Sequence, residues 1–161
     1  MPNDSVTILH ASIDHAKILA RGSDGRLTAR RPDGPHPKEF TAESVPVASL
    51  ADLHELLELL QHDRRASVIR GALIDGVDPV GVYRRKKGDG RAFEAAPRRW
   101  LMIDIDGFAT PDTVLDGNTD ADATLAHVVA HLPPAFQNAA CVFQWSASMG
   151  LEQGRVRVHL W

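Results

Sequence analysis

The stretch that decides the fold is WLMIDIDG, residues 100–107. Side chains on a β-strand point alternately to opposite faces of the sheet. The leucine and the two isoleucines of this stretch therefore share one face, and Asp104 and Asp106 share the other. We expect a strand here whose apolar face packs against helices. Gly107 is expected to let the chain turn sharply where the strand ends, and to leave room for a ligand.

The two aspartates predict a metal site. Adjacent carboxylates at the end of a buried strand repel each other and are costly to remove from water. A divalent cation removes that conflict, and oxygen ligands of this kind suit Mg²⁺ or Mn²⁺ bridging to substrate phosphates. The alternative interpretation is that Asp104 and Asp106 only cap the turn that follows the strand.

A second polar strand lies at residues 155–161, RVRVHLW. Alternation places its valines and leucine on one face, and Arg155, Arg157, His159 and Trp161 on the other. An arginine and a histidine two residues apart suit phosphate oxygens, and a histidine can also act as an acid or base. The alternative is a solvated sheet face with cross-strand ion pairs.

The loop before this strand strengthens the phosphate interpretation. Ser146 and Ser148 supply hydroxyl donors, and Gly150 lets backbone amides approach an anion.

The rest of the chain reads as a mixture of strands and helices. Periodicity and turn residues predict strands at 6–9, 67–70, 140–145 and 156–161, a hairpin within 17–31, and helices at 50–60 and 121–132. Ser49 and Asp52 form a capping box for the first helix. Residues 32–37 read as a loop and 75–97 as irregular. This mixture predicts an α+β fold whose later strands form one sheet.

Composition sets the broad class. The 161 residues, 43% hydrophobic and 24% charged, suit one soluble globular domain. A lone cysteine, Cys141, excludes internal disulfides and weakly favours a reducing cytoplasm. No apolar run is long enough to span a bilayer, and Met1–Asp4 does not begin a signal peptide. We therefore expect a cytoplasmic protein with no membrane partner.

Nucleic-acid binding would have to come from local clusters, because the formal net charge is −3. The densest basic segment is Arg84-Arg85-Lys86-Lys87, followed by Arg91. We expect it to contact template or primer phosphates without regard to sequence. The alternative is a solvated loop.

The two polar strands, in this order, resemble the archaeo-eukaryotic primase superfamily, and especially the bifunctional primase-polymerase domains of plasmids, phages and mobile elements. The family's first motif is an apolar strand ending in Asp-x-Asp, matched by residues 101–106. Its second motif ends in x-His on a strand and is matched by residues 157–159, with Arg157 where serine is commoner. The match covers residues 100–161.

The resemblance implies a function and roles for these residues. Asp104 and Asp106 would bind the catalytic Mg²⁺ or Mn²⁺ ions, and His159 would contact the triphosphate of a nucleoside triphosphate. Arg157, Ser146 and Ser148 are further nucleotide-binding candidates. The implied activity is DNA primase or polymerase chemistry in mobile-element replication, with single-stranded DNA as template or primer. A helicase module or protein is a further expected partner.

One family motif is absent from the sequence. A third acidic strand follows the histidine motif in the family, whereas this sequence ends at Trp161. We therefore expect an incomplete RNA-recognition-like core at residues 98–161, preceded by an N-terminal extension at 1–97, and an isolated chain that is weakly active or inactive.

Two other interpretations remain. One is a non-catalytic DNA-binding accessory domain. The other is a haloacid-dehalogenase-type phosphatase, disfavoured because no lysine follows Asp106.

Overall fold

A computed structural model of the chain describes residues 4–85, 88–109, 120–146, 149 and 155–161. Strands dominate it and helices are few, which confirms the α+β class. The chain forms two compact units. Unit 1 comprises Met1–Ile18 and Arg31–Leu101, and unit 2 comprises Leu19–Arg30 and Met102–Trp161.

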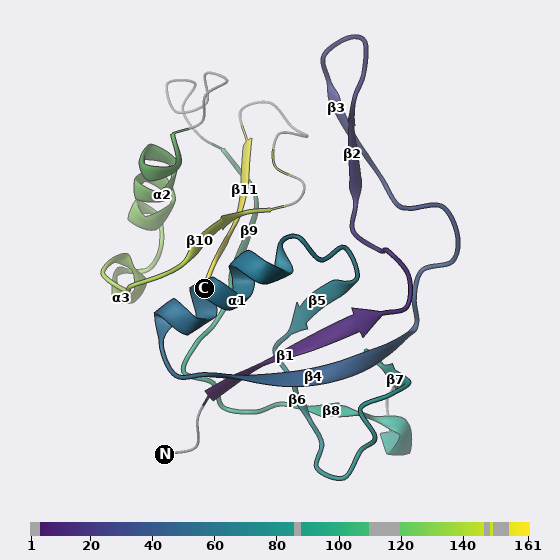
Figure 1. Cartoon of the computed structure of the whole chain (residues 1–161). Helices are drawn as coiled ribbons and strands as arrows, with labels where there is room; N and C mark the ends of the chain where they lie inside the picture. Colours follow the sequence, from purple (N-terminus) through teal and green to yellow (C-terminus); the bar gives the residue numbers. More distant parts are fainter. Residues whose placement is uncertain (1–3, 86–87, 110–119, 147–148, 150–154) are drawn as a thin grey trace. The chain divides into compact units, whose positions relative to one another are not determined.

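Unit 1 is built on a four-stranded antiparallel sheet with the order β5-β1-β4-β7 (Figure 1). The strands are β1 (Asp4–Ala11), β4 (Glu39–Val47), β5 (Ala66–Ile69) and β7 (Val82–Tyr83). The predicted strands at 6–9 and 67–70 are confirmed. β4, the longest strand of this sheet, was not predicted, although it pairs with the whole length of β1.

Helix α1 (Leu50–Leu60) follows β4 and begins as the sequence predicts. The Asp52 amide donates to the Ser49 hydroxyl at 3.1 Å, and the Ser49 amide donates to the Asp52 carboxylate at 3.2 Å. This reciprocal pair satisfies two amides that a helix start otherwise leaves without partners. Leu53 and Leu57 are the buried residues of the helix.

The rest of unit 1 contains only short elements, as expected for its irregular region. They are β6 (Ala72–Leu73), which pairs with β8 (Phe93–Glu94), and the 3₁₀ turn η1 (Gly88–Gly90). One face of the large sheet carries an apolar cluster made of Leu9, Ala11, Phe40, Ala42, Val82 and Ala92.

Unit 2 contains a three-stranded antiparallel sheet with the order β10-β11-β9 (Figure 1). Its strands are β9 (Ile103–Ala109), β10 (Phe143–Trp145) and β11 (Arg155–Leu160). Its helices are α2 (Ala121–Ala130) and α3 (Pro134–Gln137). The later strands thus share one sheet, as predicted. The predicted hairpin is also present, as β2 (Ile18–Arg21) and β3 (Leu27–Arg30).

Apolar residues from one face of this sheet pack with α2. Val156 and Val158 of β11 are fully buried, and Val128 of α2 is 1% exposed. Ile103 and Ile105 of β9 join the same cluster. The face opposite this core carries the polar side chains of β9 and β11. Within the described residues, no helix is long and apolar enough to cross a membrane.

Candidate functional site

The polar residues of the two predicted motifs lie directly opposite each other on neighbouring strands. In the register of β9 and β11, Asp104 pairs with His159 and Asp106 pairs with Arg157. His159 Nε2 lies 3.5 Å from Asp104 Oδ1. Arg157 Nη1 donates to Asp106 Oδ1. Two motifs that lie about fifty residues apart in the chain therefore form one patch, which we call the acidic–basic face.

A β-bulge at Gly107 sets the geometry of this face. Register pairs Arg157 with Asp106 but Val156 with Phe108, so Gly107 is the extra residue on β9. Its φ of 73° lies in the left-handed region that glycine adopts without strain. Alternation alone would place Phe108 beside the aspartates, whereas the bulge turns it into the apolar core. The expectation that the strand ends at Gly107 is wrong, because β9 continues to Ala109.

The carboxylates of this face are solvated. The side chains of Asp104 and Asp106 are 61% and 64% exposed, whereas those of Arg157 and His159 are 21% and 26% exposed. The premise that burial makes a cation necessary is therefore wrong. Water and the guanidinium of Arg157 already offset the repulsion between the aspartates. A metal ion at this face would bind to carboxylate oxygens that are already exposed to solvent. Its binding would not neutralise a buried charge.

Strand β10 extends the face by one residue that sequence reasoning did not single out. Gln144 pairs with His159 on the side opposite Asp104. Its Oε1 accepts a hydrogen bond from Trp161 Nε1 at 3.3 Å. The Trp161 ring stands edge-on to the His159 ring, with centroids 6.3 Å apart. The alternation of β10 is the signal that could have found Gln144.

Part of the predicted serine loop can be placed. The Ser146 amide donates to the Arg157 carbonyl at 2.9 Å, which ties the end of β10 to β11. The Ser146 carbonyl accepts from the Met149 amide at 2.9 Å. Ser148 and Gly150, the other predicted phosphate contacts, lie outside the described residues. Ser146 therefore lies next to Arg157 in the structure.

The carboxylates of Asp104 and Asp106 suit a metal ion that binds together with the phosphates of a substrate. Among the described residues, no three Asp, Glu, His or Cys side chains form a group that could enclose an ion. Mg²⁺ commonly binds through one or two carboxylates, several waters and substrate phosphates. Asp104 and Asp106 supply the two carboxylates. Asp120 does not add a third, because its carboxylate caps α2 by accepting from the Asp122 and Ala123 amides.

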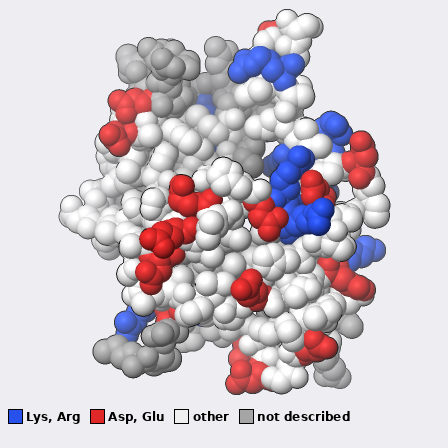
Figure 2. Space-filling view, in the orientation of Figure 1, with Lys and Arg blue, Asp and Glu red and all other residues white. Residues whose placement is uncertain are grey.

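The predicted DNA-binding segment belongs to unit 1. Arg84 and Arg85 are exposed in the turn after β7, whereas Lys86 and Lys87 lie outside the described residues. Figure 2 shows no broad basic field on the face in view: acidic side chains gather over α1, and basic ones lie beside acidic ones elsewhere. Any nucleic-acid contact of this segment would therefore be local.

Two residues of the segment before β9, Arg98 and Trp100, have structural partners in β1. The buried Arg98 lies 3.6 Å from the Asp4 carboxylate and donates to the Ser5 hydroxyl at 2.7 Å. Trp100 donates through its indole N–H to the Ser5 carbonyl at 3.1 Å. These contacts hold the segment before β9 against β1.

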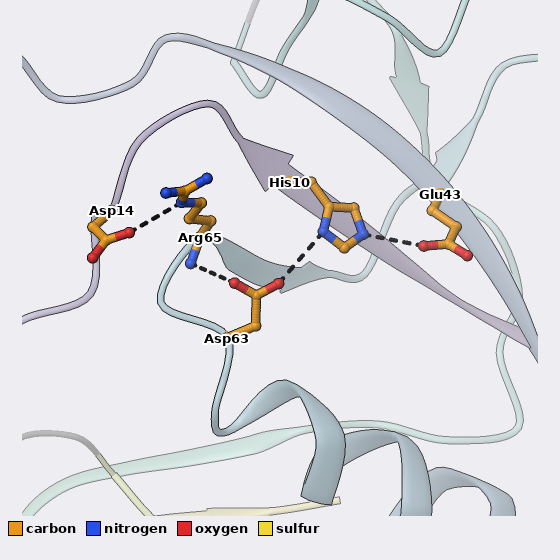
Figure 3. Close-up of polar contacts among 5 residues, drawn as sticks. All are labelled: His10, Asp14, Glu43, Asp63 and Arg65. Atoms are coloured by element: carbon orange, nitrogen blue, oxygen red, sulfur yellow. Dashed lines mark hydrogen bonds and ion pairs between the residues drawn. The ribbon is translucent and has the colours of Figure 1, made fainter.

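A polar network in unit 1 centres on His10 (Figure 3). His10 Nε2 lies 3.1 Å from Glu43, and its Nδ1 lies 3.7 Å from Asp63. Asp63 accepts from the Arg65 amide at 2.8 Å, and the Arg65 side chain pairs with Asp14 at 3.1 Å. The network joins β1, β4 and the segment after α1.

Comparison of the chain with protein-family models, with curated proteins and with solved structures found no match.

Proposed function

We propose that unit 2 carries the metal- and nucleotide-binding face of a DNA primase-polymerase, an enzyme that joins a nucleoside triphosphate to a primer 3′-hydroxyl. The observation that supports this proposal is the cross-strand pairing of Asp104 with His159 and of Asp106 with Arg157. Both halves of the motif match thus lie on one solvent-facing patch. An antiparallel sheet with α2 packed on its other face is also compatible with an RNA-recognition-like core.

Each side chain of the face has a distinct role in this proposal. Asp104 and Asp106 hold Mg²⁺ or Mn²⁺ together with the triphosphate, using oxygens that are already exposed. When bound, the metal would neutralise the phosphates and lower the pKa of the attacking hydroxyl. Arg157 and His159 contact the phosphate oxygens, since a guanidinium and an imidazole are suitable donors.

The aspartate–arginine pair predicts a competition. Arg157 donates a hydrogen bond to Asp106. A triphosphate offers Arg157 an alternative partner, and a metal offers Asp106 one. Metal and nucleotide should therefore bind more tightly together than either binds alone. The enzyme would synthesise or extend primers during plasmid or mobile-element replication, with a helicase as partner.

Calorimetric titration tests the proposal. A nonhydrolysable nucleoside triphosphate is titrated into the chain with Mn²⁺, in wild type and in the variants Asp104→Asn and His159→Ala. Matched controls are Asp75→Asn and His62→Ala, exposed residues of unit 1 outside the acidic–basic face. We expect both site variants to lose about tenfold or more in affinity, equivalent to about 1.4 kcal/mol, and the controls to bind like wild type.

Two results would count against it. One is that wild type does not bind the nucleotide, and the other is that the control variants lose as much affinity as the site variants. The first result would favour the second candidate function, a non-catalytic DNA-binding accessory domain. The observation that favours this candidate is the Arg157–Asp106 ion pair, which neutralises one of the two carboxylates.

A further inference from the structure

Unit 1 contains a pocket of about 610 Å³ whose walls carry four Lys or Arg side chains. They are Arg31, Lys38, Arg84 and Arg85, and none of the described residues that line the pocket is Asp or Glu. A volume of this size is within the range of sites that take small organic ligands. The described lining residues all belong to unit 1, whereas the acidic–basic face belongs to unit 2.

Strand pairing explains how this charge gathers. The register of β4 and β7 pairs Glu39 with Tyr83. Lys38, just before β4, therefore comes toward Arg84, just after β7, because the strands are antiparallel. Arg31 precedes the same end of β4 along the chain. Side chains from sequence positions more than fifty residues apart thus line one cavity.

The four basic residues of the pocket differ from Arg64 and Arg65 of unit 1, which pair with an acidic side chain. Arg64 and Arg65 both pair with Asp14, at 3.5 and 3.1 Å (Figure 3 draws the second pair). Within the described part of the chain, no such ion pair is formed by the four basic residues of the pocket. Four like charges around one cavity repel each other, and an anion in the cavity would relieve that repulsion.

Aromatic side chains also line the wall, together with Pro37 and Ser67. The Phe40 ring is 6% exposed, and the His15 ring stands edge-on to it with centroids 6.2 Å apart. His36 lies next to His15, with ring centroids also 6.2 Å apart, and Tyr83 is partly exposed. The Tyr83 hydroxyl donates to Glu39. Rings beside guanidinium groups are the combination that binds a base and its phosphates.

We propose that this pocket binds the phosphate groups of a nucleotide, either a free nucleotide or the 5′-terminal nucleotide of a DNA strand. Arginine forks match phosphate oxygens in pairs, and Lys38 adds a compact charge. The pocket is a second, metal-independent nucleotide site that goes beyond the function proposed for unit 2.

The environment of His15 agrees with a positively charged cavity. Burial lowers the pKa of His15 from its ordinary value of 6.5, and the neighbouring His36 and, more weakly, Arg84 lower it further. The backbone of Ile13 and the Asp63 carboxylate act in the opposite direction with smaller effect. His15 is therefore neutral at neutral pH, and a bound phosphate would favour its protonation.

Fluorescence anisotropy without divalent cations tests the pocket, since EDTA removes any contribution from Asp104 and Asp106. The probe is a short oligothymidine with a 5′-phosphate and a dye at its 3′ end, and the competitors are the unlabelled 5′-hydroxyl strand and free dTTP. The pocket variant is Arg31→Gln with Lys38→Gln. The matched control is Arg64→Gln with Arg65→Gln, which removes the same charge from residues paired with Asp14.

We expect the pocket variant to lose about tenfold or more in affinity for the phosphorylated probe, and the control to lose less than about threefold. Strong competition by dTTP assigns the pocket to free nucleotides. Weak competition by both dTTP and the 5′-hydroxyl strand assigns it to a 5′-phosphorylated strand end. The proposal is overturned if no phosphate probe binds at low salt, or if both double variants lose affinity equally.

The variant Asp104→Asn should bind the probe like wild type. The result of this test is therefore separate from the result of the test of unit 2.

Lowering the pH from 8 to 6 should tighten binding, because His15 gains charge beside the charges of Arg31, Lys38, Arg84 and Arg85, with Asp63 as the opposing acidic group. The terminal phosphate titrates in the same range. The variant His15→Gln separates the two effects. We expect it to show a flatter dependence of affinity on pH than wild type, and an unchanged dependence would contradict the placement of the phosphate in this pocket.

Discussion

At the scale of single residues, Gly107 determines which side chains share the acidic–basic face. Its positive φ is costly for residues with a Cβ, by about 1–2 kcal/mol, and more for β-branched residues. We expect Gly107→Val to destabilise the protein by more than about 1.5 kcal/mol and Gly107→Asn by less, because asparagine tolerates this conformation. Urea denaturation measures both. Equal losses for the two variants would contradict the assignment of the bulge.

Arg157 should have opposite effects on the two ligands of the face. Its removal frees Asp106 from a competing cation, so Arg157→Ala should bind Mn²⁺ alone at least as tightly as wild type. The same variant should lose about tenfold in affinity for the triphosphate. Calorimetry with each ligand separates the effects. Arg155→Ala is the matched control on the same strand, because Arg155 donates at 2.7 Å to the Gly107 carbonyl. A parallel loss of both ligands in Arg157→Ala would refute the competition.

Residue patterns predicted which side chains share a face but not which ones meet. Alternation placed Asp104 with Asp106 and Arg157 with His159. Their cross-strand partners depend on the register of β9 and β11, and that register contains a bulge. A glycine in a strand can mark a bulge, a bend or an end, and sequence alone did not distinguish these. The exposure of the two carboxylates depends on which other parts of the chain pack over that face of the sheet. A local sequence pattern does not predict such packing.

At the scale of elements, the start of α1 is the feature that sequence predicted most completely. Removing the Ser49 hydroxyl leaves the Asp52 amide without its partner. We expect Ser49→Ala to cost about 1 kcal/mol of stability, as N-cap replacements do. Ser49→Asp should retain most of it, since aspartate also accepts at this position. Thermal unfolding by circular dichroism measures both variants, and an unchanged melting temperature for Ser49→Ala would contradict the capping role.

The same cap predicts a pH dependence. Hydrogen bonds from the Ala48 amide, the Ser49 hydroxyl and neighbouring amides lower the pKa of Asp52 below its ordinary value of 3.8. A carboxyl group with a lowered pKa stabilises the fold above the ordinary value, and this contribution is lost as the pH falls through the lowered pKa. Wild type should therefore exceed Asp52→Asn in stability at pH 6, and the difference should shrink below pH 3.8. A difference that stays constant down to pH 2.5 would contradict this.

Strand β4 shows why some elements escaped sequence analysis. Its residues, EFTAESVPV, mix alanine and serine with a proline near the end, so the apolar alternation is weak. Tertiary pairing with β1 makes it a strand. The walls of the basic pocket depend on this strand, and for that reason Lys38 and Arg31 could not be connected with Arg84 from sequence.

At the scale of the whole molecule, the division into two compact units predicts separable unfolding. Leu57 in unit 1 and Leu160 in unit 2 are 4% and 3% exposed. Truncation of a buried leucine to alanine costs about 2–5 kcal/mol. We expect Leu160→Ala to accelerate amide hydrogen exchange mainly in β9, β11 and α2, and Leu57→Ala mainly in unit 1. Equal acceleration throughout the chain in both variants would mean that the units unfold as one.

The central claim, that the acidic–basic face binds a metal–nucleotide complex, is tested most directly by paramagnetic broadening in NMR. Mn²⁺ and a nonhydrolysable nucleoside triphosphate are added at substoichiometric amounts to ¹⁵N-labelled protein. The account predicts selective loss of amide signals at residues 103–106 and 157–160, with those of α1 retained although its surface carries Asp52, Glu55 and Glu58. Broadening that centres on α1, or that is spread evenly over the acidic surface, would contradict it.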